Sequence, residues 1–218
     1  MGIVFTNDGA TAFEALKYDS PDSAGNNGAL LVFDAVNRTL TSTMLLKFVP
    51  TALLMAPDGL TAYILSNTGM ITYYDVLSGT ADLSVSTYPP GSNAGYPGAG
   101  SAVYIHPDGT RLFWNVGVYL TVFDLTTRQV TNQFNSGLPT TVNRTFSLSQ
   151  DGGRAYFSDQ QGDVAILDTY YGTVLASYNA GAATSIFGGP PIAPELSDND
   201  SSAYTPSDAA ALQSLTLG

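Results

Sequence analysis

Residues suited to acid–base or metal chemistry are scarce in this sequence. His106 is its only histidine, and it has no cysteine. A tetrahedral zinc site would therefore lack its usual ligands, and a histidine-based triad is excluded in the same way. His106 stands two residues before Asp108, and three similar Asp-Gly turns carry Thr6, Ala56 and Ser149 at that place. This variation indicates a position beside a turn, and we predict no catalytic residue.

The acidic residues are almost all aspartates. Glu14 and Glu195 are the only glutamates among the 18 acidic residues. Glycosidase chemistry needs two carboxylates that face each other across a cleft, and the sequence shows no such pair. Half of the aspartates stand in two recurring turns, where an aspartate accepts hydrogen bonds from its own backbone. We therefore interpret these aspartates as turn residues.

Oxygen-rich loops are the remaining candidates for a metal site, because Ca²⁺ prefers oxygen ligands. Asp19 and Asp22 lie in one such loop, and Asp198 and Asp200 begin another. The second loop has Ala203 where a calcium loop needs glycine, and it lacks the glutamate that closes such a loop. We expect solvated turns and no cofactor, with calcium in these loops as the alternative.

The overall charge argues against two classes of partner. The chain has 18 acidic and 7 basic residues and a formal net charge of −11 at pH 7. Nucleic-acid phosphates and anionic lipid headgroups repel such a chain. No apolar run reaches the ~20 residues that a membrane-spanning helix needs. We therefore expect neither nucleic acid nor a membrane span.

A repeat organises the whole chain. Four Asp-Gly pairs are each followed by an aromatic residue, and a fifth, degraded copy ends at Tyr204. The aromatic residues of the four full copies are Phe13, Tyr63, Phe113 and Tyr156. A second marker, an apolar residue followed by aspartate, comes later in each copy, at Asp34, Asp75, Asp124 and Asp168. The predicted repeats are residues 1–48, 49–99, 100–142, 143–189 and 190–218.

One repeat can be divided into four short strands joined by turns. The predicted strands are residues 51–56, 61–66, 70–76 and 81–87. Several strands are apolar on both faces, as expected for a sheet packed between two neighbours. Four strands in each repeat of this length are typical of a β-propeller blade. We predict a single all-β propeller domain, or a fragment of a larger propeller, with about five antiparallel blades, the last of which lacks its outer strand.

The repeat resembles a known family. Residues Ala56–Val76 and His106–Leu125 show the pattern best: an Asp-Gly turn, an apolar-aromatic strand, a small turn and a strand that ends in aspartate. This pattern resembles the YVTN-type repeats of bacterial and archaeal surface-layer proteins, which are similar to lactonase-like propellers. The resemblance implies an extracellular, cell-surface or periplasmic protein, whose signal peptide is absent from this sequence. It also implies, as an alternative, a lactonase-like hydrolase that uses side chains of a central channel.

One rim of the predicted propeller is rich in loops. The links between blades and the loops between second and third strands emerge on the same side, and their Tyr, Ser, Gly and Asn content is typical of adaptable binding loops. The candidate ligand-binding residues are Tyr88, Asn93, Tyr96, Asn115, Tyr119, Asp159 and Asp163. We expect a non-catalytic module that binds protein or glycan there. Trp114 is expected in the core between blades.

The predicted ring has an open edge. The fifth blade is incomplete, and no further repeat is left to close the ring. Exposed sheet edges favour pairing with another chain. We therefore expect missing blades or a second chain at this edge. A purely structural repeat or assembly unit is the remaining alternative.

Overall fold

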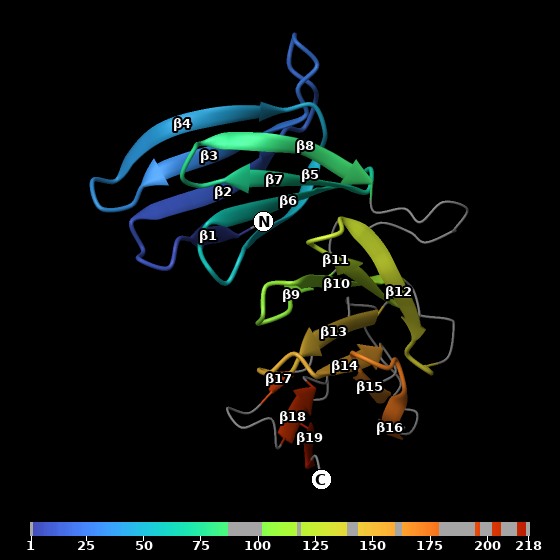
Figure 1. Ribbon diagram of the computed structural model, residues 1–218. Coiled ribbons are helices and arrows are strands. Elements are labelled where there is room, and N and C mark those ends of the chain that lie inside the picture. The colour runs from blue at the N-terminus through green and yellow to red at the C-terminus, as the bar shows by residue number, and fades with distance from the viewer. Residues whose placement is uncertain are drawn as a thin grey trace.

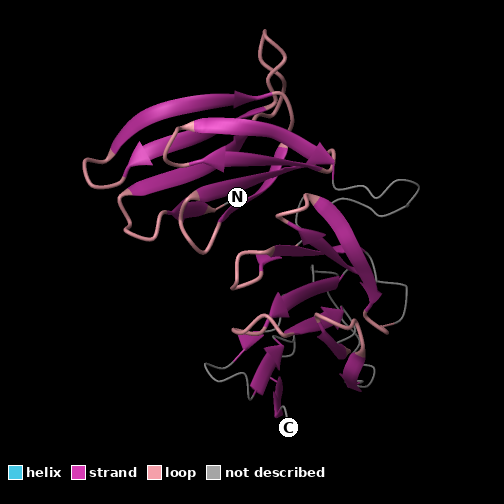
Figure 2. Ribbon diagram, in the orientation of Figure 1, coloured by secondary structure: helices cyan, strands magenta, loops and turns pink. Residues whose placement is uncertain are grey.

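A computed structural model describes residues 2–86, 102–116, 119–138, 144–159, 163–178, 195–196, 202–205 and 213–216. All regular secondary structure in these ranges is β-strand (Figure 2). Over the same ranges, no helix has the length and hydropathy that crossing a membrane would require. The described part of the chain is thus all-β, as the repeat predicts.

The described strands form five antiparallel sheets, and the strand order within each sheet follows the chain (Figure 1). The first sheet contains β1 (Ile3–Phe5), β2 (Thr11–Lys17), β3 (Gly28–Asp34) and β4 (Thr39–Leu46). The second contains β5 (Pro50–Met55), β6 (Thr61–Ser66), β7 (Met70–Asp75) and β8 (Thr80–Ser86). These four strands agree with the predicted ones to within a residue at each end.

The later sheets repeat the same order. The third sheet contains β9 (Val103–Ile105), β10 (Arg111–Val116), β11 (Tyr119–Asp124) and β12 (Gln129–Asn135). The fourth contains β13 (Arg144–Leu148), β14 (Arg154–Asp159), β15 (Val164–Asp168) and β16 (Val174–Tyr178). The fifth has three described strands, β17 (Glu195–Leu196), β18 (Ser202–Thr205) and β19 (Gln213–Thr216).

The Asp-Gly turns join the first two strands of each full sheet in one way. In each turn the glycine adopts a positive φ, between 68° and 75°, which an L side chain rarely adopts. The aspartate accepts a hydrogen bond from the backbone amide two residues later, for example from Ala10 to Asp8 at 3.0 Å and from Leu60 to Asp58 at 2.9 Å. The repeated dipeptide therefore fixes the hairpin, as expected from turn chemistry.

The turns between third and fourth strands are equally regular. Asp75 accepts a hydrogen bond from the Ser78 amide at 2.7 Å, and Asp124 accepts one from the Thr127 amide at the same distance. The residue four positions after the aspartate is left-handed in every case: it is Arg38, Gly79, Arg128 and Gly172, with φ of 58°, 67°, 58° and 68°. Two repeats therefore place an arginine where the other two place glycine.

The hydrophobic core lies between the sheets. We call the face that carries the repeated aromatic residue, such as Phe13, the front face of a sheet, and the opposite face the back face. Each of three core clusters joins one front face to the back face of the next sheet. The first cluster includes Phe13 and Leu30 with Leu53 and Ile64. The second includes Tyr63 and Leu65 with Trp114 and Phe123, and the third includes Phe113 and Val122 with Phe146 and Phe157.

Trp114 is fully buried between the second and third sheets, which confirms its predicted position in the core. The face-to-face stack is propeller-like, but the sheets do not close into a ring. The first sheet (blue) and the fifth sheet (red) lie at opposite ends of the molecule (Figure 1).

The Asp-Gly turns also contact one another from sheet to sheet. The Asn7 side-chain amide donates a hydrogen bond to the Pro57 carbonyl oxygen at 2.7 Å. A Cβ atom built on Gly109 would lie 3.4 Å from the ring of Pro57, and one on Gly152 would lie 2.5 Å from His106 Nε2. Each turn thus rests on the glycine of the next one, which fixes the register between neighbouring sheets.

Candidate functional site

His106 has a structural role in its turn. Its side chain is buried, and Nδ1 lies 2.8 Å from Asp108 Oδ1. In the equivalent turns the hydroxyls of Thr6 and Ser149 donate to Asp8 and Asp151, each at 2.6 Å. The imidazole therefore replaces a hydroxyl group, which agrees with the position beside a turn that the sequence indicates. Its Nε2 atom is buried, and no described residue hydrogen-bonds to it.

A charged cluster surrounds His106 at the joint between the third and fourth sheets. The Arg111 guanidinium lies 4.3 Å from the ring centroid of Tyr170 and 3.7 Å from Asp108 Oδ2. Burial raises the pKa of Asp108, but hydrogen bonds from Thr110 and His106 outweigh burial, so that this pKa lies below its ordinary value. The cluster thus contains a stacked arginine and a stabilised carboxylate, and it ties two sheets together.

The predicted ligand-binding residues that the structure describes lie at the edge of the sheets opposite the Asp-Gly turns. Asn115 is buried near the end of β10, and Tyr119 begins β11 with 45% of its surface exposed. Asp163 is buried directly before β15, and Asp159 is the last residue of β14. Tyr88, Asn93 and Tyr96 lie outside the described residues. Of the described candidates with a described side chain, Tyr119 alone is exposed, and ligand binding at this rim stays a prediction.

Two of the four calcium candidates, Asp19 and Asp22, lie among the described residues. Both carboxylate oxygens of Asp22 accept hydrogen bonds within their own loop, from the Ala24 and Asn26 amides and from the Asn26 side chain. Those bonds, led by the one from the Asn26 side chain, lower the pKa of Asp22. Asp19 is exposed, whereas Asp198 and Asp200 lie outside the described residues. Among the described residues, no group of three or more His, Asp or Glu side chains could hold a metal ion.

The most distinctive surface of the described chain is the back face of the first sheet. Cross-strand pairing places Ile3 opposite Glu14 and Phe5 opposite Ala12, and Leu31 and Phe33 continue the two rows on β3. We call these six residues the first-sheet back face. Ile3 and Phe5 are 55% and 51% exposed. Neither belongs to a core cluster.

The same positions are covered in every later four-stranded sheet. The register is identical: Leu53 pairs with Ile64, Val103 with Trp114, and Phe146 with Phe157. Leu53 is 8% exposed and Phe146 is fully buried, because the front face of the preceding sheet lies against them. The first-sheet back face therefore resembles the back faces that are buried between sheets, but no described sheet packs against it.

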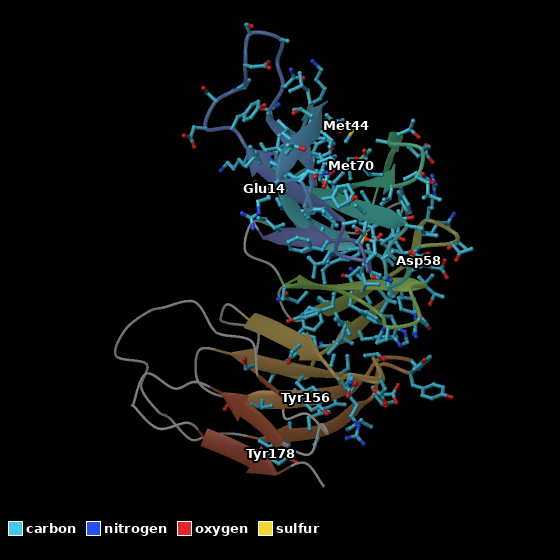
Figure 3. All side chains as sticks on the ribbon, turned by 90° about the vertical axis from the view of Figure 1, so that its left-hand side faces the viewer. Glu14, Met44, Asp58, Met70, Tyr156 and Tyr178 are labelled. Atoms are coloured by element: carbon cyan, nitrogen blue, oxygen red, sulfur yellow. The ribbon has the colours of Figure 1, made fainter. Side chains whose placement is uncertain are left out.

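Glu14 distinguishes this face from its equivalents. It takes the place of Ile64, Trp114 and Phe157, which are all fully buried. Figure 3 labels Glu14 on the side of the first sheet away from Met70 of the second sheet. Among the described residues, none forms a hydrogen bond or ion pair with its carboxylate. An acid thus stands within an otherwise apolar sheet face.

Sequence reasoning missed the first-sheet back face, although the signal was present. Aligning the four Asp-Gly turns places Ile3 and Phe5 over Leu53 and Met55, and it places Glu14 over Ile64. The alternation of β1 and β2 then assigns these residues to one face. Which of the two faces the preceding sheet covers is visible only in the packed structure.

Comparison with known proteins supports the fold and does not assign a family. No family model matches the sequence, and no curated protein matches it. Among solved structures, a chain of Kuenenia stuttgartiensis hydrazine synthase is similar, with a TM-score of 0.65 and 16% sequence identity. The alignment covers 94% of this chain and 56% of that one, so this chain spans little more than half the length of the hydrazine synthase chain. At this identity the likeness shows a shared fold alone.

Proposed function

We propose that this chain is a non-catalytic interaction module, built from the blades of a β-propeller and belonging to an exported or cell-surface protein. The observation that supports the proposal is the first-sheet back face, on which Ile3 and Phe5 expose half of their surface. Contiguous exposed apolar surface marks interaction sites in soluble proteins. The module would bind a protein partner there, and the rim around Tyr119 offers a second, polar surface for protein or glycan.

The use of the aspartates also supports a non-catalytic role. Most described turn aspartates accept at least one backbone amide hydrogen bond, as Asp151 does from Gly153 at 2.8 Å. A hydrolase of the lactonase-like kind would instead need such carboxylates to face a central channel. That alternative requires acids whose oxygen atoms are not already engaged by turns.

Photo-crosslinking in the cells that produce the protein tests the proposal. A benzophenone amino acid at position 5 should give a discrete crosslinked product. Leu77 provides the matched control position, because it is 81% exposed in the turn after β7 and lies outside the first-sheet back face. If position 5 gives no more product than position 77, the first-sheet back face is not an interaction site and the proposal fails.

A further inference from the structure

The turn between β3 and β4 carries a motif that the interaction role does not use. Residues Asn37-Arg38-Thr39 match Asn-x-Ser/Thr, the acceptor motif for N-linked glycosylation of exported proteins. Two further copies of the motif begin at Asn143 and Asn199, which lie outside the described residues. We propose that Asn37 carries an N-linked glycan, an inference that rests on the exported location proposed above.

The exposure of Asn37 follows from its place in the repeat. It stands three residues after Asp34, in a turn that projects from the end of the first sheet (Figure 1). The residues at the same place in the next three sheets are all exposed: Ser78, Thr127 and Tyr171. Each of those three sheets packs against a preceding sheet. A neighbour on the first-sheet back face would therefore leave Asn37 accessible as well.

The hydrogen bonds of the turn are compatible with a linkage at the Asn37 side chain. The backbone amide of Asn37 donates to Asp34 Oδ1 at 2.8 Å, and its side-chain nitrogen Nδ2 donates to Asp34 Oδ2 at 2.7 Å. An asparagine side-chain amide has two N–H groups, and a glycan replaces the hydrogen of only one. The other N–H can still donate to Asp34, so the folded turn accommodates the modified residue.

The fold itself does not require an asparagine at this place. In the corresponding turns of the next three sheets, the backbone amide of the residue there also donates to the aspartate, whether that residue is serine, threonine or tyrosine. The backbone thus forms the turn with different side chains. Thr39, the hydroxyl residue of the motif, is exposed at the start of β4. Both side chains that a glycosyltransferase reads are therefore on the surface.

The modification is a group transfer from a lipid-linked sugar phosphate to the asparagine. The Asn37 Nδ2 atom forms a bond to the anomeric carbon of the sugar. The bond between that carbon and the phosphate oxygen breaks, and the lipid-linked phosphate leaves with the electron pair. The side-chain amide gives up one proton to a base of the transferase, so the step needs neither an oxidant nor a reductant.

Peptide mapping of the protein recovered from its own cells tests the inference. Trypsin cuts after Lys17 and Arg38, so that Asn37 lies within the peptide 18–38 and Thr39 lies outside it. This peptide should be heavier than its sequence mass by a whole number of sugar residues, and fragment ions should place them on Asn37. Thr39→Ala should abolish the added mass, whereas Thr39→Ser should retain it. Circular dichroism checks that both variants fold.

Asn67 provides an internal control for the motif. It is exposed in the turn after β6, but Gly69 stands where the motif needs serine or threonine, so Asn67 should stay unmodified. An unmodified peptide 18–38 would overturn the inference, and so would added mass that persists in Thr39→Ala. Fractionation of the same cells shows whether the exported location fails with it. The crosslinking at position 5 tests the interaction role independently of the glycan.

Discussion

Gly152 lies against the turn of the preceding sheet, and its substitution should show how much that contact matters. An added Cβ would lie 2.5 Å from His106 Nε2, and the glycine also has a φ of 75°. Gly152→Ala should therefore lower the free energy of unfolding by about 3 kcal/mol, the combined cost of the left-handed conformation and of overpacking. Urea denaturation followed by fluorescence measures this change.

Gly9 provides the matched control for Gly152. It occupies the same position of the first turn with a φ of 68°, but a Cβ there would meet nothing within 4 Å. Gly9→Ala should cost only the conformational part, about 1 kcal/mol. Equal losses for the two variants would mean that the turns do not support each other across the sheets.

Arg128 and Arg38 give a second matched pair. Arg128 lies 4.3 Å from the ring centroid of Tyr73 and forms an ion pair with Asp82, and both partners are in the preceding sheet. Arg128→Gly should lower the free energy of unfolding by about 1 kcal/mol, because the loss of these contacts outweighs the relief of the left-handed backbone. Arg38 is exposed at the equivalent position of the first sheet.

Arg38→Gly should leave the free energy of unfolding unchanged or raise it by up to about 1 kcal/mol, because relief of the left-handed conformation is partly offset by the greater freedom of glycine in the unfolded chain. Thermal denaturation of both variants makes the comparison. A destabilised Arg38→Gly variant would show that the arginine at this turn position is required in its own right.

At the scale of single residues, the sequence predicts roles that the repeat itself encodes. Trp114 could be assigned to the core because other copies have Ile64 and Phe157 at its position. His106 could be assigned to a turn because other copies have hydroxyl residues or alanine there. The left-handed conformation of Arg38 and Arg128 could not be predicted, because a non-glycine residue with positive φ contradicts its own local preference.

The aspartates of the turns should make the stability of the fold depend on pH. Side-chain hydrogen bonds, first from Thr6 and from Ser149, lower the pKa of Asp8 and Asp151 below the ordinary value of 3.8. The pKa values of Asp34, Asp75 and Asp124 are also lowered, and in these three the largest cause is a hydrogen bond from a backbone amide. A carboxylate whose pKa is lower in the folded state stabilises the fold above its unfolded pKa. This stability is lost as the pH falls through the lowered values.

We therefore expect the free energy of unfolding to fall steeply below about pH 4, the region of the unfolded aspartate pKa. Urea titrations at a series of pH values measure the slope. In Asp151→Asn the side chain can still accept the Gly153 amide but does not titrate, so the acid slope should be smaller than in the wild type. An unchanged slope in this variant would show that Asp151 does not contribute to acid unfolding.

At the scale of elements, strands were easier to predict than surfaces. Asp-Gly pairs and the apolar-aspartate marker fix where strands end, so the predicted strand 61–66 coincides with β6. The predicted ligand-binding rim was harder to predict, because loop sequences such as the one around Tyr119 have no regular residue spacing from which their geometry could be inferred. The first-sheet back face escaped prediction for another reason: exposure depends on which neighbour is present, and sequence periodicity does not record that.

The first four sheets form a stack in which each sheet packs on its neighbours in the chain. Three inter-sheet clusters carry the described core, and none of them joins the first sheet to the fifth. A stack of this kind resembles a repeat protein, in which stability is a sum of units and nearest-neighbour interfaces. Units with one neighbour then open more readily than units with two.

Hydrogen exchange should reveal this gradient. Amides that bridge β1 and β2 should exchange faster than those that bridge β10 and β11, because the first sheet is covered on one face and the third on both. Peptide-level exchange followed by mass spectrometry measures both regions in one experiment. Equal protection of the two sheets would show that the stack opens as one cooperative unit.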